Sequence, residues 1–291
     1  MKRTTFQELI QTRQDRMSVI RASRLSGHPR SSHYYKPKLR KSISDNSNKI
    51  RREAVLIEAI EKEALSHPSY GVRRITAMLR RSGIIVTRKR VYRLMKLTNL
   101  VKRRSVRKHL VKRRELVVPK GPNELWEEDI TYIWCGRDGW CYLFNILDCF
   151  TREWVAYVFS KLCGSDESVR CLDRAIIERF PDGNIPEVTI RNDGGPQYTS
   201  ARFLEALKAY KNINHEVTGK NRPDEDAYVE AFHKSIKEDY IWQHELDSFH
   251  EADELMTSFY HDYNWNRPHS SLNYLTPKEF ASSWALRGVN E

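Results

Sequence analysis

The sequence predicts an α/β domain, with a mixed sheet and flanking helices, preceded by an all-α region. Apolar residues recur at helical spacing before position 120, whereas after Pro122 they alternate as in strands. The charge changes at the same place: residues 1–120 hold 33 Lys and Arg against 8 Asp and Glu, and residues 121–291 hold 17 against 30. A basic part with a net charge of +25 and an acidic part with −13 indicate two functions in one chain.

The overall composition excludes several classes of protein. Of the 291 residues 40% are hydrophobic and 30% are charged, which excludes a disordered chain and a transmembrane protein. The first residues contain no apolar signal core, so a cytoplasmic protein is expected. The five cysteines form no CxxC pair, and neither a disulfide framework nor a structural zinc site is expected. The basic part should bind a polyanion, because neutralised phosphates release counterions.

Three short helices are expected in the basic part, at residues 50–66, between Gly71 and Ser82, and at Arg88–Leu97. Thr87 is a good N-cap for the third helix, and a glycine-containing turn before the last of three helices is typical of a helix-turn-helix module. The apolar face of the first helix comprises Val55, Leu56, Ala59, Ile60, Ala64 and Leu65. The basic side chains of the third helix either meet DNA or form a solvated face: Arg88, Lys89, Arg90, Arg93 and Lys96.

The run Lys102–Arg114 has eight basic residues in thirteen and no acidic one. It either contacts DNA, through Arg103 and Arg104 among others, or is a flexible linker that its charge keeps soluble. The expected domains are a basic helical N-terminal segment (1–48), a helix-turn-helix DNA-binding domain (49–101), a basic linker (102–121), an acidic α/β core with C-terminal helices (122–282) and a tail (283–291).

The acidic part should begin with three antiparallel strands. The second is almost continuously apolar, which is typical of a central strand buried on both faces. Helices and short strands then alternate, which gives a mixed sheet with helices on its faces. The strands are expected at Trp126–Trp134, Trp140–Leu147, Trp154–Phe159 and Val188–Ile190 and near His215–Val217, and two long helices from about Asp226 to Trp242 and from His250 to Tyr263.

Asp129, Asp193 and Glu230 are the candidate catalytic residues. Asp129 lies in the middle of the first strand, and Asp193 follows a strand and precedes two glycines, where open α/β sheets bind ligands. Glu230 lies beside the buried stripe of a helix, on one face with Lys234 and Lys237. From spacing alone, Asp129 could equally be a strand-edge charge, Asp193 a turn residue and Glu230 the ion-pair partner of Lys234.

Several separated segments carry a more specific pattern. They are Tyr70–Ile75 (YGVRRI), Pro122–Ile133 (PNELWEEDITYI), Asn192–Ser200 (NDGGPQYTS) and Tyr263–Pro277 (YNWNRPHSSLNYLTP). In this order, over about residues 50 to 282, they resemble the OrfB-type transposases of the IS-three family of bacterial insertion sequences. The resemblance implies a ribonuclease H-like core similar to retroviral integrases.

This resemblance also implies functional residues. The acidic triad of the family (the DDE motif) falls on Asp129, Asp193 and Glu230, and the basic positions that touch terminal DNA fall on Lys234 and Lys237. The chain departs from the family pattern at several acids, which either strengthen metal binding or mark a copy of reduced activity. These are Glu127, Glu128, Asp224, Glu225 and Asp226.

Three carboxylates that converge in space raise one another's pKa unless cations join them. Two Mg²⁺ ions, for which Mn²⁺ can substitute, are therefore the expected cofactors, with Asp129 bridging both ions and Asp193 and Glu230 each holding one. The expected reaction is cleavage at the ends of an insertion sequence, followed by transfer of the 3′-OH strand to target DNA.

The resemblance implies three kinds of partner: DNA as element ends and target, further copies of the chain, and an upstream-frame OrfA-type protein or a fusion to it. A bacterial, nucleoid-associated location would follow. The alternative functions are a non-catalytic DNA-binding repressor or inactivated remnant of the same element, and a general nuclease that cuts without joining. Tyr263–Pro277 either contributes residues to the catalytic face or is a turn that packs on the core; packing is expected, with Arg267 and His269 reaching DNA phosphate.

Overall fold

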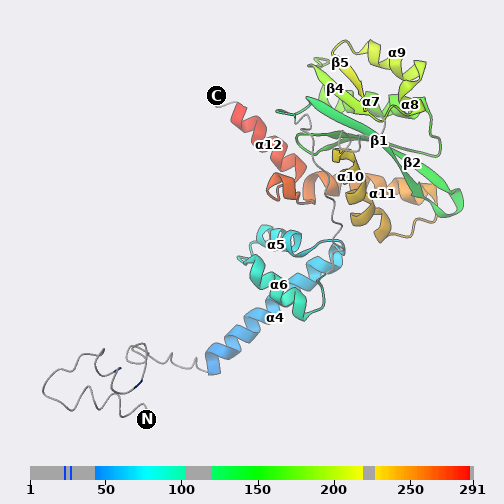
Figure 1. Cartoon of the computed structure of the whole chain (residues 1–291). Helices are drawn as coiled ribbons and strands as arrows, with labels where there is room; N and C mark the ends of the chain where they lie inside the picture. The colour runs from blue at the N-terminus through cyan, green and yellow to red at the C-terminus, as the bar shows by residue number, and fades with distance from the viewer. Residues whose placement is uncertain (1–22, 24–26, 28–42, 102–118, 219–226, 289–291) are drawn as a thin grey trace. The chain divides into compact units, whose positions relative to one another are not determined.

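The computed structural model describes Ser23, Gly27 and residues 43–101, 119–218 and 227–288 (Figure 1). The chain divides into two units, residues 1–55 and 56–291. Within the described ranges, no helix has both the length and the apolar character that crossing a membrane requires. The predicted contacts Arg103 and Arg104 and the acids Asp224, Glu225 and Asp226 lie outside the described residues.

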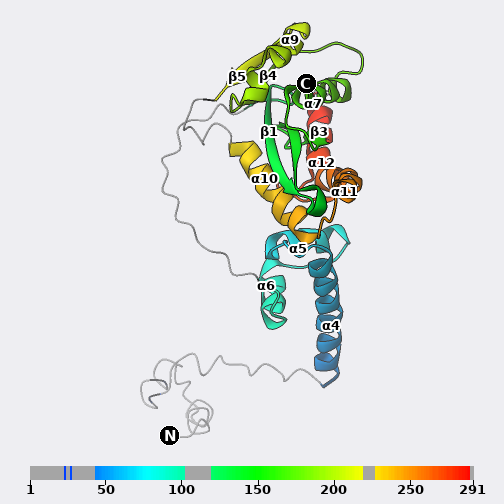
Figure 2. The same cartoon turned by 90° about the vertical axis from the view of Figure 1, so that its right-hand side faces the viewer.

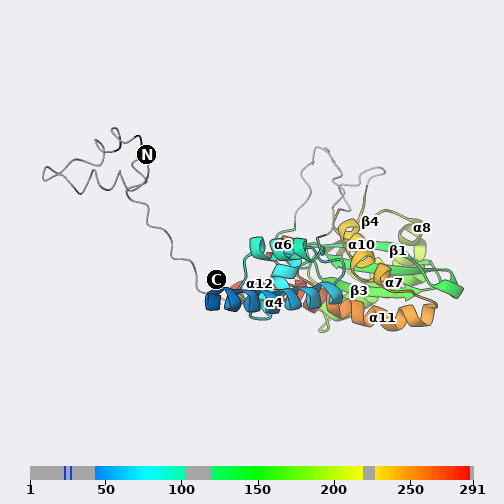
Figure 3. The same cartoon turned by 90° about the horizontal axis from the view of Figure 1, so that it is seen from below.

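Three helices form the predicted helix-turn-helix region: α4 (Ile43–Ser66), α5 (Val72–Arg81) and α6 (Arg88–Leu97). Figure 1 shows α5 and α6 against the second half of α4, and Figure 3 shows the same region from below. The Thr87 side chain accepts a hydrogen bond from the backbone N–H of Arg90 and so caps α6, as its position predicts. Leu56 and Ile60 of α4 are buried against α5 and α6, whose buried core residues are Ile75, Leu79, Val91, Leu94 and Met95.

The buried stripe of α4 is narrower than its sequence pattern predicts. Val55 and Leu65 are 61% and 79% exposed, although both fall beside the buried positions Leu56 and Ile60. The core around α4 is supplied by the two short helices α5 and α6, which cover only part of its circumference. The apolar pattern predicted the helix and its end at Ser66, but not its start, which lies at Ile43 and not at residue 50, nor how much of it is covered.

A five-stranded sheet forms the core of the acidic part. The strands are β1 (Leu125–Trp134), β2 (Trp140–Asp148), β3 (Trp154–Ser160), β4 (Val188–Asn192) and β5 (Ile213–Val217). Their order is β3-β2-β1-β4-β5, with β1, β2 and β3 antiparallel and β1, β4 and β5 parallel. The predicted mixed sheet with three leading antiparallel strands is confirmed.

Two hydrophobic cores cover the two faces of this sheet. One contains Trp126, Phe144 and the buried sides of α7 (Ser165–Arg179) and α9 (Ala201–Ala209), whereas the other contains Ile133, Leu143 and the buried sides of α10 (Ala227–Asp239) and α11 (Phe249–His261). Trp126 and Ile133 of β1 face opposite cores because successive side chains of a strand alternate. Figure 2 shows α10 running beside β1.

The C-terminal helix crosses the expected boundary between the core and the tail. α12 (Pro277–Gly288) continues to Gly288, so most of the expected tail at 283–291 is helical, and Trp284 packs against Phe150 with ring centroids 4.7 Å apart. A capping box starts the helix: Thr276 N–H donates to Glu279 Oε2, and Glu279 N–H donates to Thr276 Oγ1. A threonine three residues before a glutamate was the local signal for this start.

Candidate active site

The two aspartates lie at the same edge of the sheet. β1 and β4 run parallel, and their pairing extends to Glu127 opposite Arg191. Asp129 lies two residues after Glu127, and Asp193 lies two residues after Arg191. Asp129 is therefore level with the end of β4, and Asp193 directly follows that end. Asp193 is exposed, and its Oδ1 accepts a hydrogen bond of 2.9 Å from the N–H of Gly195. Gly194 has φ +68, a conformation that favours glycine.

Asp129 is held from two sides. Its Oδ1 accepts a 2.8 Å hydrogen bond from the N–H of Ile130, and its Oδ2 lies 3.4 Å from Nδ1 of His233 on α10. Its side chain is 32% exposed, whereas that of His233 is 12% exposed. The carboxylate therefore reaches solvent at one end and has a fixed protein neighbour at the other.

The hydrogen bonds of Asn145 define the state of the His233 ring. Asn145 faces Asp129 across the β1–β2 pair, and its Nδ2 donates to the carbonyl of Leu143 and lies 3.1 Å from Nε2 of His233. Burial, reinforced by Lys237, lowers the pKa of His233 to about 3, so the ring is neutral. An amide nitrogen donates only, so Nε2 accepts and the ring proton is on Nδ1, which lies 3.4 Å from Asp129 Oδ2. Sequence reasoning missed both Asn145 and His233.

Helix α10 brings Glu230 to the same region. The N–H of Val229 donates to Glu127 Oε2 of β1 at 2.7 Å, and His233 contacts Asp129, so α10 is fastened to β1 on both sides of Glu230. Glu230 is exposed, one helical turn before His233. Lys234 Nζ lies 3.7 Å from Glu238 Oε1. Lys234 therefore forms an ion pair with Glu238 and not with Glu230, the partner that its spacing also allowed.

The three carboxylates are of the right chemical type for a divalent cation, because Mg²⁺ prefers oxygen ligands. As the side chains lie, no group of three Asp, Glu, His or Cys in the described ranges is close enough together to hold a metal ion. Asp193 and Glu230 are both exposed and can change rotamer. Coordination by all three residues therefore requires movement of these two side chains toward Asp129.

The two glutamates before Asp129 do not belong to that set. Glu127 is fully buried, accepts the hydrogen bond from Val229 and has an oxygen 3.8 Å from Arg191. Glu128 is 1% exposed on the opposite face, where burial, reinforced by the Asp129 charge, raises its pKa well above the ordinary value. Their burial argues against the expectation that either acid strengthens metal binding.

The predicted DNA-binding residues divide into three groups. Arg88, Lys89, Arg93 and Lys96 of α6 are exposed and Arg90 is half-buried. Lys234 and Lys237 share α10 with Glu230. Arg267, in contrast, is 2% exposed, and its Nε donates to Asp239 at 2.6 Å. We therefore do not retain Arg267 as a DNA contact, because its guanidinium is bound within the protein.

Comparisons with known proteins match the helical region and the α/β core separately. The Integrase core domain models match residues 119–223 and 211–277, and an HTH-like domain model matches residues 51–109. The 31.7 kDa protein of insertion element IS407 from Burkholderia multivorans is 30% identical over 91% of each chain. The transposase for insertion sequence element IS904 from Lactococcus lactis is 30% identical over 81% of this chain and 96% of that protein. This chain belongs to the OrfB-type transposases of the IS-three family.

The transposase is thus a metal-dependent polynucleotidyl transferase with a ribonuclease H-like integrase core, and it acts in DNA transposition. Among solved structures, a chain of the simian T-cell lymphotropic virus intasome is similar, with a TM-score of 0.48 and 18% identity, over 77% of the transposase and 74% of that chain.

Proposed function

We propose that the transposase cleaves the ends of its insertion sequence and joins the freed 3′-OH strand to target DNA, with Asp129, Asp193 and Glu230 as the catalytic residues. One observation supports this above the others. Asp129 and Asp193 occupy the same edge of adjacent parallel strands, and the helix that carries Glu230 is fastened to β1 at residues on both sides of it.

The three residues would hold two Mg²⁺ ions, with Mn²⁺ as a substitute. The chemistry that such ions supply when bound is activation of the attacking oxygen and stabilisation of the leaving 3′ oxygen. The protein's own contribution is to hold the ligands: His233 orients Asp129, and the Gly195 N–H holds one oxygen of Asp193. The contact with His233 reduces the freedom that Asp129 would otherwise lose on binding a cation, whereas Asp193 leaves its present rotamer to coordinate.

The proposed DNA contacts follow from charge and position. Lys234 and Lys237 lie on the helix that carries Glu230 and would contact the phosphates beside the cleaved bond. The exposed basic face of α6 would bind the phosphates of duplex DNA. We further propose that several copies of the chain act together, because two element ends must be handled at once, and that an upstream-frame OrfA-type protein supplies the choice of terminal sequence.

The substitution Asp193→Asn tests the catalytic assignment. It removes one negative charge from an exposed side chain, so folding and DNA binding should persist, whereas cleavage and joining should fall by at least about 1000-fold. The assay uses the full chain, with and without the upstream-frame product, on duplex that carries an element end, in Mg²⁺, Mn²⁺ or EDTA.

Asp166→Asn is the matched control, because Asp166 is 73% exposed and pairs only with the exposed Arg202 in the described structure. It should retain full activity. Joining by Asp193→Asn would refute the assignment. Binding by the wild type without metal-dependent cleavage would indicate the repressor or remnant, and cleavage without joining or preference for element ends would indicate a general nuclease.

A further inference from the structure

Helix α5 presents two adjacent arginines to different surroundings. Arg74 donates to both oxygens of Asp239, at 3.1 and 3.3 Å, and Asp239 also accepts from the buried Arg267. The side chains of Asp239 and Arg267 are only 4% and 2% exposed, so this contact holds α5 against α10 and the segment after α11. Arg73, one residue earlier, is exposed and lines a pocket.

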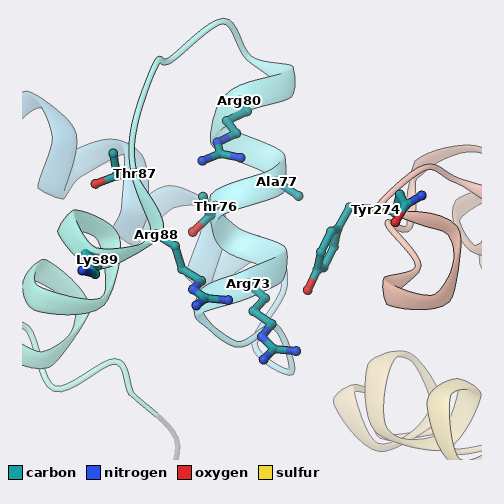
Figure 4. Close-up of a pocket in the computed structure, with 9 residues that line it drawn as sticks. Arg73, Thr76, Ala77, Arg80, Thr87, Arg88, Lys89 and Tyr274 are labelled. Carbon is teal, nitrogen blue, oxygen red and sulfur yellow. The ribbon is translucent and has the colours of Figure 1, made fainter.

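This pocket has a volume of about 630 Å³ and lies between α5, the start of α6 and the turn at Asn273 and Tyr274 (Figure 4). Four basic side chains line it: Arg73, Arg80, Arg88 and Lys89. Of the described residues that line it, none is acidic. The Nε of Arg80 donates to the carbonyl of Val86 at 3.1 Å, which fixes this arginine across the turn between the two helices. Such a pocket suits an anion.

An aromatic ring forms the opposite wall. Tyr274 projects from its turn toward α5 and faces Ala77 and Arg73 (Figure 4). It has φ +65, directly after Asn273 with φ +54, and left-handed backbone is unfavourable for a tyrosine. The turn is nevertheless closed, because Tyr274 N–H donates to the carbonyl of His269 at 2.8 Å and Leu272 is buried beneath it. Strained backbone of this kind is concentrated at functional positions.

The combination of basic side chains with one half-exposed ring matches a nucleotide better than a simple anion. Arginine and lysine recognise phosphate, and an aromatic face stacks on a base that has left its own stack. A base inside a duplex has both faces covered, so the ring of Tyr274 is open to an unpaired nucleotide or, on its outer face alone, to the last base pair. The volume is within the range of pockets that enclose small ligands.

We propose that this pocket binds one unpaired nucleotide at or next to the end of the DNA, with its base on Tyr274 and its phosphate near Arg73 and Arg88. The inference rests on the proposed function only in taking DNA as the ligand. It assigns the turn of the Tyr263–Pro277 segment to DNA end recognition, while the rest of that segment packs in the core.

The test compares binding of the full chain to blunt duplexes and to the same duplexes with one or two unpaired nucleotides at the end. Fluorescence anisotropy in EDTA measures binding without catalysis. The wild type should prefer the duplex with the unpaired end by about fivefold to a hundredfold, the ratio that one base–aromatic stack supplies. Tyr274→Gly should abolish this preference, whereas Tyr274→Phe, which keeps the ring, should retain it.

Glycine is the informative replacement because it accepts the left-handed backbone, so loss of the ring is separated from loss of folding. Trp242→Leu, which removes an exposed ring outside the pocket, is the matched control and should keep the preference. Equal binding of both duplexes by the wild type, or an unchanged preference in Tyr274→Gly, overturns the proposal. Because blunt-duplex binding and metal-dependent joining are measured separately, neither result bears on the catalytic assignment.

Discussion

The neutral ring of His233 connects a buried amide with the half-exposed carboxylate of Asp129. Asn145 fixes the proton on Nδ1, and Nδ1 lies 3.4 Å from Asp129 Oδ2. A polar contact of this type restricts the rotamers of a metal ligand and raises the fraction that is ready to coordinate. His233 is thus a positioning residue, which acts through Asp129.

His233→Leu should lower the apparent affinity for divalent metal, because Asp129 loses the neighbour that orients it. The expected effect is a ten- to hundredfold higher Mg²⁺ concentration for half-maximal strand cleavage, or an equal loss of rate. His233→Asn places an amide N–H near the former Nδ1 position and should restore most of the wild-type Mg²⁺ response. Unchanged Mg²⁺ titrations for His233→Leu, with thermal melting that shows an intact fold, would contradict this role.

Two of the recognisable sequence segments meet where α5 contacts α10. Arg74 belongs to the Tyr70–Ile75 segment and Arg267 to the Tyr263–Pro277 segment, and both donate to Asp239. Burial alone would raise the pKa of Asp239, but the charges of Arg267 and Arg74 outweigh it, and the pKa is lowered. Because both arginines pair with Asp239, their place in the two segments is explained without any contact to DNA.

The lowered pKa of Asp239 predicts a loss of stability in acid. A carboxyl group whose pKa is lower in the folded state stabilises the protein above its unfolded pKa, near 3.9, and loses that contribution as the pH falls through the folded value. At pH 7 the free energy of unfolding of Asp239→Asn should therefore be about 3–5 kcal/mol lower than that of the wild type, because two arginines lose their buried partner.

Thermal melting followed by circular dichroism from pH 7 to pH 3 measures this effect. The gap between wild type and Asp239→Asn should be largest at pH 7 and should narrow below pH 4. Asp166→Asn removes one partner of an exposed ion pair, so its free energy of unfolding should stay within about 1 kcal/mol of the wild-type value at every pH. A melting temperature of Asp239→Asn equal to that of the wild type at pH 7 would contradict the role of the pair.

For the molecule as a whole, the separation of charge is the dominant feature. Residues 1–120 carry +25 and residues 121–291 carry −13, although the acidic part contains the catalytic residues that we propose. The acidic core on its own repels DNA, so binding of the substrate depends on the basic part. Affinity should then be governed by counterion release.

DNA affinity should fall steeply with salt. The slope of log affinity against log salt concentration should be about −0.9 for each phosphate that is neutralised. The double substitution Arg90→Gln and Lys96→Gln changes two residues of α6 that lie outside the basic pocket. It should make the slope less negative by the contribution of up to about two phosphate contacts. Arg202→Gln, an exposed arginine of the core, should leave it unchanged. A flat salt titration of the wild type would contradict the assignment of the basic part to DNA.

Much of the fold was predictable because its determinants are local. The alternation in Trp126–Trp134, the apolar run of β2 and the Thr87 cap fixed element types within one or two residues of their bounds. The predictions failed where coverage by other elements decides the outcome. Val55 and Leu65 looked buried by spacing but are left exposed, and Arg267 looked like a phosphate ligand but is enclosed.

Periodicity, caps and charge distribution are properties of neighbouring residues, so they determine the strands, the helices and the two-part division without reference to the folded chain. The candidate acids were assigned by the resemblance of whole sequence segments to the family. The parallel pairing of β1 with β4, the burial of Glu127 and Glu128, the contact of His233 with Asp129 and the ion pairs of Asp239 were decided only by tertiary structure. Each joins residues distant along the chain, and their free energy depends on desolvation and geometry that exist only after the elements have packed.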